Sequence, residues 1–432
     1  MAFSLDEPHE LERLLSAVDP QVAAILDRAR AGQDISADEA TLLFRTRGLD
    51  FSAVVLVADA LRRGTVGDVV TYVVNRNINF TNVCIKHCGF CAFSRDFRTE
   101  EGYFLPMEEV VRRAIEAWEY GATEVCIQAG LPPHMEGDLY LRLCRTIKTT
   151  LPDMHIHGFS PEEVLYGAIR SRWTIADYLK ALQEAGVGSL PGTSAEILDD
   201  GLRQLIAPGR ISTAQWIDVI TTAHRLGLPT TATMMYGHIE TDEHKARHLS
   251  LLRELQKQTG GFTEFVPLSF VPAEAPMYRK SLVNGLRPGP SGMEIMKVHA
   301  VSRIMLNNHI PNLQVSWVKD GLPMSQLCLT AGVNDLGGTL INESISTAAG
   351  APHGQLMRPR ELHALIRDAG RIPAERTTTY KIRRRYDDAE VPASPLDLVP
   401  EESEAVFGSY DRLVKQDSFR YHKPQVVSTG RP

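Results

Sequence analysis

From Val69 onward, short β-rich runs alternate with longer amphipathic stretches, and this alternation restricts the fold more than any other feature. It predicts parallel strands joined by crossover helices. Seven or eight such units in about 275 residues fit a closed TIM-type barrel better than an open sheet, although periodicity alone also admits a doubly wound sheet. The expected strands are residues 69–77, 124–128, 154–159, 188–190, 230–236, 263–268 and 313–317, with a weaker eighth near Val333.

Helices are expected before the strands and between them. Apolar residues recur at helical spacing over residues 10–31, and Pro20 should split this stretch in two. Ser36 and Glu39 form a capping-box pattern, and another helix is expected over residues 52–63. The crossover helices are expected near residues 107–120, 137–149, 174–185, 195–206, 213–226, 242–259, 292–307 and 323–330.

These patterns divide the chain into four regions. Residues 1–68 are expected to form a small helical N-terminal subdomain, and residues 69–347 an α/β barrel of the (β/α)8 type. Residues 348–375 form a closing segment with one more helix. Residues 376–432 are polar and proline-containing, which predicts an irregular extension that wraps the surface or is partly disordered.

Composition and charge exclude several classes of protein. The chain has 432 residues, of which 43% are apolar, and a net charge of −7. This is ordinary globular composition, and it favours neither nucleic acid nor an anionic membrane as a partner. The one basic run, residues 381–385, is interpreted as a solvated tail segment. No signal peptide or membrane span is recognisable, so we expect a cytoplasmic protein.

Three cysteines, Cys84, Cys88 and Cys91, lie close together at spacings of four and three. A structural zinc ion usually takes four ligands in two separated pairs, and a fourth ligand here would have to be His87, on the same tight loop. Electron-transfer iron–sulfur clusters also take four cysteines. Three thiolates around four irons leave one iron open, as in a catalytic centre. The other cysteines are expected to be buried small side chains: Cys126, Cys144 and Cys328.

The cysteine spacing, with Phe90 just before the last cysteine, resembles that of the radical S-adenosylmethionine (SAM) superfamily. In that superfamily SAM chelates the open iron of a 4Fe-4S cluster, which donates one electron and yields a 5′-deoxyadenosyl radical. The motif follows the first expected strand, so it should lie at the end of the barrel that carries active sites. Structural zinc and a redox thiol pair are the alternatives.

Longer strings narrow the resemblance to the CofH family, which supplies subunit 2 of FO synthase, a 5-amino-6-(D-ribitylamino)uracil–L-tyrosine 4-hydroxyphenyl transferase. The resemblance covers roughly residues 20–375, with Ala129 where a glycine and Pro132 where a histidine would be expected. Two menaquinone-pathway enzymes, aminofutalosine synthase and dehypoxanthine futalosine cyclase, share much of it and are the alternative. The strings that carry it are residues 75–96, 124–133, 154–164, 188–200, 230–241, 260–272 and 331–346.

The resemblance implies a reaction and its partners. Hydrogen is taken from the amino group of L-tyrosine, the Cα–Cβ bond breaks to leave 2-iminoacetate, and the 4-hydroxybenzyl group joins 5-amino-6-(D-ribitylamino)uracil. The implied partners are a companion radical SAM subunit, CofG, which acts next, and an electron donor such as flavodoxin or ferredoxin. The alternative from another class is a non-catalytic metal-binding interaction module.

The resemblance also implies residues that contact the cofactors, beyond the three cluster cysteines. Phe90 would lie near the adenine of SAM, or else would only pack in the core. Gln128 and Gly130 end the second expected strand, where the backbone would hold the amino group of SAM, or else would only form a strand-to-helix turn without a ligand. Glu196 and Arg203, seven residues apart, can share a helix face and would contact the ribose and carboxylate of SAM. Solvated surface charges are the alternative for this pair.

Polar residues on two further strands are candidates for substrate contact. His155 and His157 share one face of the third expected strand, because side chains alternate along a strand. A buried structural histidine is the alternative for each. Tyr236, His238 and Glu240 lie at or just past the end of the fifth expected strand and could hold the tyrosine or transfer a proton. A solvated loop or a structural cap is the alternative for these three residues.

Near the last expected strand, Asn334, Asp335 and Glu343 form a final group of candidates. The uracil ring and the ribityl hydroxyls need directed hydrogen bonds, which such side chains provide. A solvated loop or a structural cap is the alternative reading of these residues.

Overall fold

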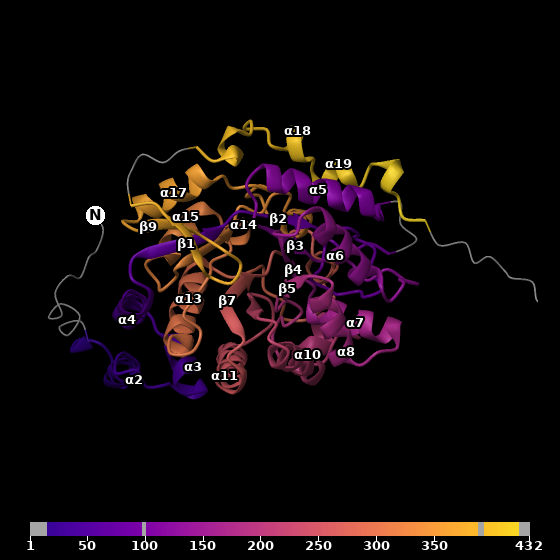
Figure 1. The fold of residues 1–432 in the computed structure, drawn as a ribbon. Helices are drawn as coiled ribbons and strands as arrows, with labels where there is room; N and C mark the ends of the chain where they lie inside the picture. Colours follow the sequence, from indigo (N-terminus) through magenta and orange to yellow (C-terminus); the bar gives the residue numbers. More distant parts are fainter. Residues whose placement is uncertain (1–14, 97–100, 388–392, 423–432) are drawn as a thin grey trace, which may run out of the picture.

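The structure is a computed structural model that describes residues 15–96, 101–387 and 393–422. At its centre, parallel strands form a barrel surrounded by helices (Figure 1). The expected α/β barrel is therefore confirmed. Its strands are β1 (Val69–Val73), β2 (Asn75–Ile78), β3 (Glu124–Ile127), β4 (His155–Gly158), β5 (Val187–Ser189), β6 (Thr230–Tyr236), β7 (Phe262–Ser269) and β8 (Asp335–Gly338).

The barrel closes partly through single backbone bridges. Regular pairing joins β2, β3, β4 and β5 as neighbours in that order. It also joins β6 with β7 and β1 with β8. Leu190 bridges to Thr230 between β5 and β6, while Leu313 and Gln314 bridge β7 to β8. The expected strand at residues 313–317 is wrong, because this segment makes only these bridges before a short helix begins.

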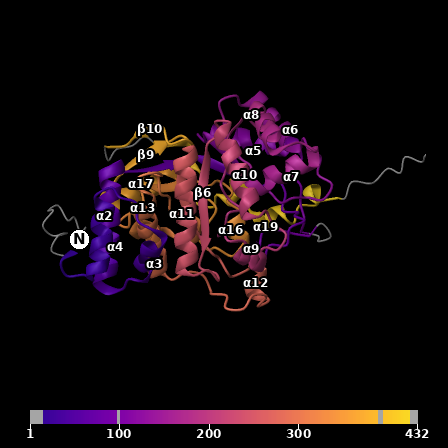
Figure 2. The same ribbon diagram turned by 90° about the horizontal axis from the view of Figure 1, so that it is seen from below.

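Helices cover the outside of the barrel (Figures 1 and 2). The structure adds α7 (Pro161–Ser171), which was not expected and begins at a capping box of Ser160 and Glu163. The helix expected at residues 195–206 begins only at Asp200, after a buried loop. The remaining helices of the barrel region are α5 (Met107–Glu119), α6 (Leu139–Thr150), α8 (Ile175–Glu184), α9 (Asp200–Ile206), α10 (Thr213–Arg225), α11 (Asp242–Thr259), α12 (Pro276–Arg279), α13 (Gly292–Leu306), α14 (Trp317–Asp320), α15 (Leu322–Cys328), α16 (Ile345–Ala348) and α17 (Pro359–Asp368).

Three N-terminal helices pack beside the barrel rather than over its end (Figure 2). The last of them packs against α13 and the middle one against α11. The expected capping box is confirmed, because Ser36 accepts from the backbone of Glu39, whose carboxylate accepts from the backbone of Ser36. The expected helix start near Glu10 lies outside the described residues. These helices are α2 (Pro20–Arg30), α3 (Ala37–Arg45) and α4 (Gly48–Val66).

Two strands that were not expected extend the sheet beyond β1. β9 (Ile372–Arg376) pairs in parallel with β1, and β10 (Ile382–Arg385) pairs antiparallel with β9. Pro373 lies within β9, although proline is disfavoured inside a strand. The basic run at residues 381–385 includes all of β10, and its side chains are exposed as expected of a solvated segment.

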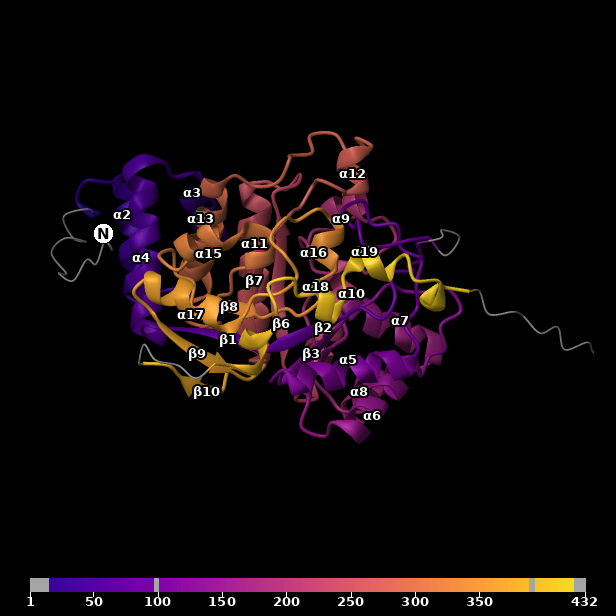
Figure 3. The same cartoon turned by 90° about the horizontal axis from the view of Figure 1, so that it is seen from above.

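The described part of the C-terminal extension runs along α5 toward the loop that holds Cys84, Cys88 and Cys91 (Figures 1 and 3). The ring of Tyr410 lies 5.6 Å from that of Phe93, and the backbone of Tyr421 donates to Gly102 at 2.8 Å. Within the three described ranges, no helix combines the length and apolar character that crossing a bilayer requires. The elements of this extension are η1 (Pro395–Leu398), α18 (Glu404–Phe407), α19 (Tyr410–Leu413) and η2 (Asp417–Phe419).

A buried ion cluster ties β9 to the barrel. Arg376 donates to both oxygens of Asp335, at 2.6 and 3.0 Å, and lies 3.6 Å from the carboxylate of Glu264. The guanidinium also stacks over the ring of Tyr380 at 4.0 Å. Both Arg376 and Asp335 are buried, so each is the main compensation for the other's charge.

We expect Arg376→Leu to lower the free energy of unfolding by about 3–5 kcal/mol, because it leaves Asp335 buried without a cation. Denaturant unfolding followed by circular dichroism measures this loss. The double variant Asp335→Asn/Arg376→Leu removes both charges and should recover a large part of it. A double variant as unstable as the sum of the two single variants would contradict this explanation.

Candidate functional site

A cavity of about 410 Å³ occupies the interior of the barrel. Its lining includes residues from the loops that follow most of the strands, and deeper residues from the strands themselves. The volume lies within the range of small-molecule sites, and loops at the carboxyl ends of barrel strands carry the active sites of such folds. The cavity is therefore the candidate active site.

The loop of residues 84–93, here called the cluster loop, follows β2 and brings Cys84, Cys88 and Cys91 to the cavity wall. Its middle is fixed through Gly89, whose N–H donates to the carbonyl of Ile206 and whose carbonyl accepts from Met277 N, both at 2.7 Å. A Cβ at Gly89 would lie 2.9 Å from the Met277 Cβ. Only glycine fits this approach without displacing a neighbour.

Gly130, after β3, presses against the start of the same loop. A Cβ added there would lie 2.2 Å from the carbonyl oxygen of Val83, so a side chain is excluded. The backbone N–H of Gly130 donates to Thr81 at 2.8 Å, and Ile85 donates to the carbonyl of Leu131 at 2.8 Å. The β3 loop and the cluster loop are thus held together by their backbones.

The three thiols fit a cluster with an open iron. All three are free, and burial raises the pKa of Cys88 to about 12, against the nearby positive charge of Arg210. Metal binding would displace those protons. In the described part of the chain, no three His, Cys, Asp or Glu side chains converge on one ion position. A four-iron cluster does not need that convergence, because each thiolate binds a different iron. His87 is exposed and does not line the cavity, so it is no fourth ligand for zinc.

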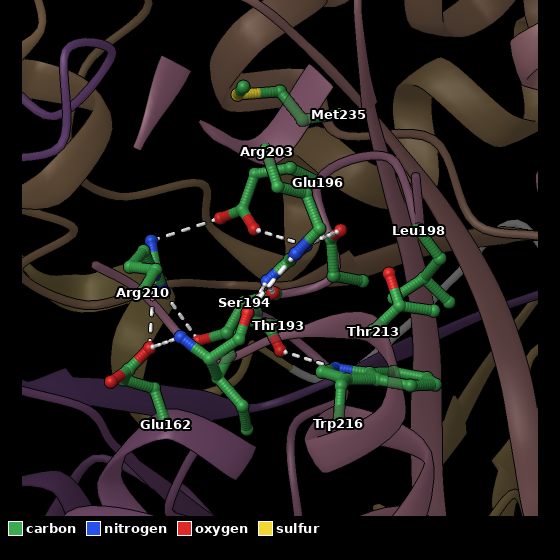
Figure 4. Close-up of polar contacts among 12 residues, drawn as sticks. Glu162, Thr193, Ser194, Glu196, Leu198, Arg203, Arg210, Thr213, Trp216 and Met235 are labelled. Atoms are coloured by element: carbon green, nitrogen blue, oxygen red, sulfur yellow. Dashed lines mark hydrogen bonds and ion pairs between the residues drawn. The ribbon is translucent and has the colours of Figure 1, made fainter. Parts of the chain in front are cut away.

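The loop after β5 has a strained backbone at the cavity wall (Figure 4). Ser194 has φ 64° and Glu196 has φ 40°, values that non-glycine residues hold only when surrounding contacts impose them. The guanidinium of Arg203 supplies such contacts, because it donates to the carbonyls of Ser194, Ala195 and Ile211.

Glu196 and Arg203 do not share a helix face, so the expected arrangement is wrong. Glu196 lies in the loop before α9, and Arg203 reaches back from the helix to within 3.4 Å of its carboxylate. Both side chains are buried, which also excludes the alternative of solvated surface charges. Arg203 does not line the cavity, so its observed contacts are with the loop.

Arg210 is a site residue that the sequence analysis missed. Its Nη1 lies 3.0 Å from the carboxylate of Glu196 and 3.6 Å from the sulfur of Cys88, and its Nη2 donates to the hydroxyl of Ser194 at 2.5 Å. The guanidinium is 5.5 Å from the ring centre of Phe90. It thus places a positive charge beside the cluster loop. No spacing rule would have found it, because it lies in an irregular segment after α9.

Two carboxylates at the start of α7 connect these parts. Glu162 lies 3.5 Å from Nε of Arg210 (Figure 4). It also lies 3.2 Å from the ammonium of Lys86 in the cluster loop. Glu163 accepts from the backbone N–H of Ala129 at 2.9 Å, and burial raises its pKa to about 7. The capping-box pattern of Ser160 and Glu163 was a signal in the sequence that could have revealed this helix start.

The structure brings nine of the expected site residues to the cavity wall. Gln128 is held there by the hydroxyl of Thr193, which donates to its Oε1 at 2.8 Å. Glu343 lies in the loop after β8 and accepts from the backbone of Ser346. The nine are Cys84, Cys88, Phe90, Cys91, Gln128, Gly130, His157, Glu196 and Glu343.

Other expected residues lie outside the cavity lining, with their polar groups bound by protein. Glu240 accepts from the backbone of Gly237 and His238, and so shapes the turn after β6. The hydroxyl of Tyr236 accepts from Ser269 at 3.0 Å. Asn334 accepts from Arg303 at 2.7 Å. Besides Arg203, the residues so placed are His155, Tyr236, His238, Glu240, Asn334 and Asp335.

His157 lines the cavity from β4, with its Nδ1 2.7 Å from the hydroxyl of Ser189. His155, from the same strand, places its Nε2 2.8 Å from that hydroxyl. Burial lowers the pKa of His157 to about 4, although Glu124 opposes the shift. Its imidazole is therefore neutral at pH 7.

This neutral histidine should make stability depend on pH. Below its ordinary pKa of 6.5 the unfolded state binds a proton that the folded state refuses, so stability falls as the pH falls toward 4. Relative to His157→Gln, the wild type should therefore lose about 2 kcal/mol of unfolding free energy between pH 7.5 and pH 5. Urea unfolding at both pH values measures this. The cost of Thr146→Ala, at an exposed position of α6 where the hydroxyl bonds only a backbone carbonyl, should be the same at both pH values; an unchanged His157→Gln difference would contradict the prediction.

Two family models and several known proteins match this chain. The model of the radical SAM superfamily matches residues 78–252, and that of the CofH/MqnC C-terminal region matches residues 259–389. The 5-amino-6-(D-ribitylamino)uracil–L-tyrosine 4-hydroxyphenyl transferase of Methanothermobacter thermautotrophicus is 49% identical over 349 residues, covering 81% of this chain and 94% of that protein. The FO synthase of Mycobacterium tuberculosis is 45% identical over 379 residues, covering 87% of this chain but only 44% of that protein.

Among solved structures, HydG, a maturase of the FeFe-hydrogenase, matches with a TM-score of 0.66. The match covers 87% of this chain and 80% of HydG at 17% sequence identity. At that identity the likeness shows the fold alone.

Proposed function

This chain belongs to the radical SAM family of 5-amino-6-(D-ribitylamino)uracil–L-tyrosine 4-hydroxyphenyl transferases, and from this we propose that it catalyses their reaction. L-tyrosine would be cleaved between Cα and Cβ, and its 4-hydroxybenzyl group joined to the aminouracil. The products would be 5-amino-5-(4-hydroxybenzyl)-6-(D-ribitylimino)-5,6-dihydrouracil, 2-iminoacetate, 5′-deoxyadenosine and methionine. The observation that best supports this proposal is that Cys84, Cys88 and Cys91 line one cavity with Arg210 and Glu196.

The cluster loop would hold a 4Fe-4S cluster through its three thiolates, which leaves one iron for SAM. When bound, the cluster supplies the single electron that turns SAM into methionine and a 5′-deoxyadenosyl radical. Arg210 would bind the carboxylate of SAM, since it is a buried cation 3.6 Å from Cys88. Glu196 would keep Arg210 oriented and accept from a ribose hydroxyl, and Arg203 would hold the Glu196 loop in its strained form.

The other site residues have supporting roles in this proposal. Phe90 would pack against the adenine, and the backbone between Gln128 and Gly130 would accept from the amino group of SAM. Neutral His157, deeper in the barrel, would hydrogen-bond the aminouracil, and so would the cavity-lining Asn77, whose buried side-chain oxygen has no partner in the described structure. Directed contacts of this kind suit a ring with several donors and acceptors.

The family to which the chain belongs also suggests partners for the reaction. A separate companion, CofG, would close the deazaflavin ring, and flavodoxin or ferredoxin would reduce the cluster in the cytoplasm. The FO synthase of Mycobacterium tuberculosis is more than twice as long as its match to this chain, which is consistent with a second activity supplied elsewhere. The second candidate is a futalosine-pathway enzyme, because the C-terminal model is shared between CofH and MqnC.

An anaerobic assay tests the proposal. The protein is reconstituted with iron and sulfide, reduced, and given SAM, L-tyrosine and 5-amino-6-(D-ribitylamino)uracil, and the products are identified by mass spectrometry. We expect 5′-deoxyadenosine together with the hydroxybenzyl adduct. Slow 5′-deoxyadenosine formation without any adduct would reject the substrates and direct the same assay to futalosine-pathway substrates. Zinc without iron or sulfide would reject the radical chemistry itself.

A further inference from the structure

We infer that Lys319 binds the α-carboxylate of the L-tyrosine substrate and so presents its amino group to the radical. This inference rests on the proposed function, because it concerns the orientation of that substrate. Lys319 was not among the residues expected from the sequence, and it lies on α14, in the region between β7 and β8.

Lys319 differs from the other cations of the cavity because its ammonium has no hydrogen-bond or ion-pair partner among the described residues. Lys86 is paired with Glu162, and Arg210 with both Glu162 and Glu196. Arg376 is paired with Asp335. A charge held in a cavity without a partner is costly, so an anion that fills the cavity would remove this cost.

The carboxylates near Lys319 are already used by the protein. Glu343 accepts from the backbone N–H groups that begin α16, including Ser346 at 2.9 Å. Asp320 accepts from the hydroxyl of Ser269 at 2.5 Å. Both act on Lys319 only through space, and burial lowers its pKa against their attraction. The ammonium is therefore free to donate hydrogen bonds to the carboxylate of a bound ligand.

The position of Lys319 suits the chemistry of the substrate. Lys319 and Cys91 of the cluster loop line the same cavity, so a substrate held at Lys319 lies in the space that the cluster loop faces. In L-tyrosine the carboxylate and the amino group share one carbon. A carboxylate held at Lys319 would therefore keep the amino group near the place where SAM is cleaved.

The two carboxylates that enter the cavity would bind to different cations. The carboxylate of SAM would go to Arg210, beside Cys88 and Phe90, and that of L-tyrosine to Lys319 on α14, elsewhere in the cavity lining. A substrate amine without a carboxylate, such as tyramine, would gain nothing from Lys319. This difference gives the inference a test that does not depend on turnover.

The test compares the wild type, Lys319→Met and Lys319→Arg as reconstituted full-length proteins with SAM present. Dissociation constants for L-tyrosine and tyramine are measured by anaerobic calorimetry. We expect Lys319→Met to weaken L-tyrosine binding about 10–150-fold and to leave tyramine binding unchanged, because a single charge-assisted contact is lost. Lys319→Arg should restore most of the L-tyrosine affinity. Lys180→Met, at an exposed position of α8, is the matched control and should change neither constant.

Kinetics of the same proteins complete the test. In Lys319→Met the KM for L-tyrosine should rise, while SAM affinity and 5′-deoxyadenosine formation without tyrosine stay at wild-type values. Equal weakening of L-tyrosine and tyramine, or a loss of SAM affinity instead, would overturn the inference. The proposed function fails separately, if the wild type forms no adduct. A wild type that does not bind L-tyrosine would overturn both.

Discussion

Replacing Cys88 with alanine is expected to abolish the formation of both 5′-deoxyadenosine and the hydroxybenzyl adduct. Cys84, Cys88 and Cys91 are the thiols of the cluster loop, whereas the fourth thiol of the cavity lining, Cys126, belongs to β3 and accepts from the side chain of Gln128. Removing one leaves an iron of the cluster without its protein ligand, so the cluster should be lost or unable to bind SAM productively. The rate should fall by more than about a thousandfold. Iron and sulfide analysis and product mass spectrometry measure the two parts of this result.

Cys144→Ala is the matched control, because this cysteine is fully buried in α6 and lies outside the cavity. It should cost about 1 kcal/mol of stability and leave iron content and products unchanged. Circular dichroism should show both variants folded. A Cys88→Ala protein that keeps its iron and forms 5′-deoxyadenosine at the wild-type rate would refute the assignment of the cluster loop.

Arg210→Met is expected to weaken SAM binding by about a hundredfold or more. The substitution removes a charge-assisted contact to the carboxylate of SAM. It also leaves Glu196 and Glu162 buried with one cation fewer, which lowers the free energy of unfolding by a further few kcal/mol. Arg210→Lys keeps the charge but loses the bidentate geometry of the guanidinium, so its affinity for SAM should lie between those of the wild type and Arg210→Met. Equilibrium dialysis of SAM against the reconstituted protein measures the affinity.

The exposed Arg142→Met on α6 is the control for Arg210→Met, and both proteins should retain the iron of the wild type. Retained iron with reduced SAM affinity separates a SAM-binding residue from one that only stabilises the cluster loop. An Arg210→Met protein that binds SAM within about threefold of the wild type would contradict the assignment.

The sequence predicted those features that depend on short-range pattern. The alternation of strands and helices predicted the barrel, the pair Ser36 and Glu39 predicted a helix start, and the three cysteines predicted the cluster loop. Each signal lies within a few residues, so no knowledge of tertiary contacts is needed to read it.

The features that escaped prediction depend on tertiary contacts. Residues 313–317 have the composition of a strand, yet they bridge their neighbours only at single positions. Glu196 and Arg203 have helical spacing, but backbone strain at the loop and the reach of the guanidinium decide where they meet. Arg210 and Lys319 lie in irregular or very short elements, where spacing carries no information about what a side chain faces.

The central claim, that this chain breaks the Cα–Cβ bond of L-tyrosine and keeps the benzyl half, can be tested with one labelled substrate. L-tyrosine carrying ¹³C at both Cα and Cβ is turned over anaerobically with unlabelled aminouracil, and the products are weighed by mass spectrometry. We expect one labelled carbon in the hydroxybenzyl adduct and the other in 2-iminoacetate or the glyoxylate that it forms in water. Both labels in the adduct, or none, would contradict the claim.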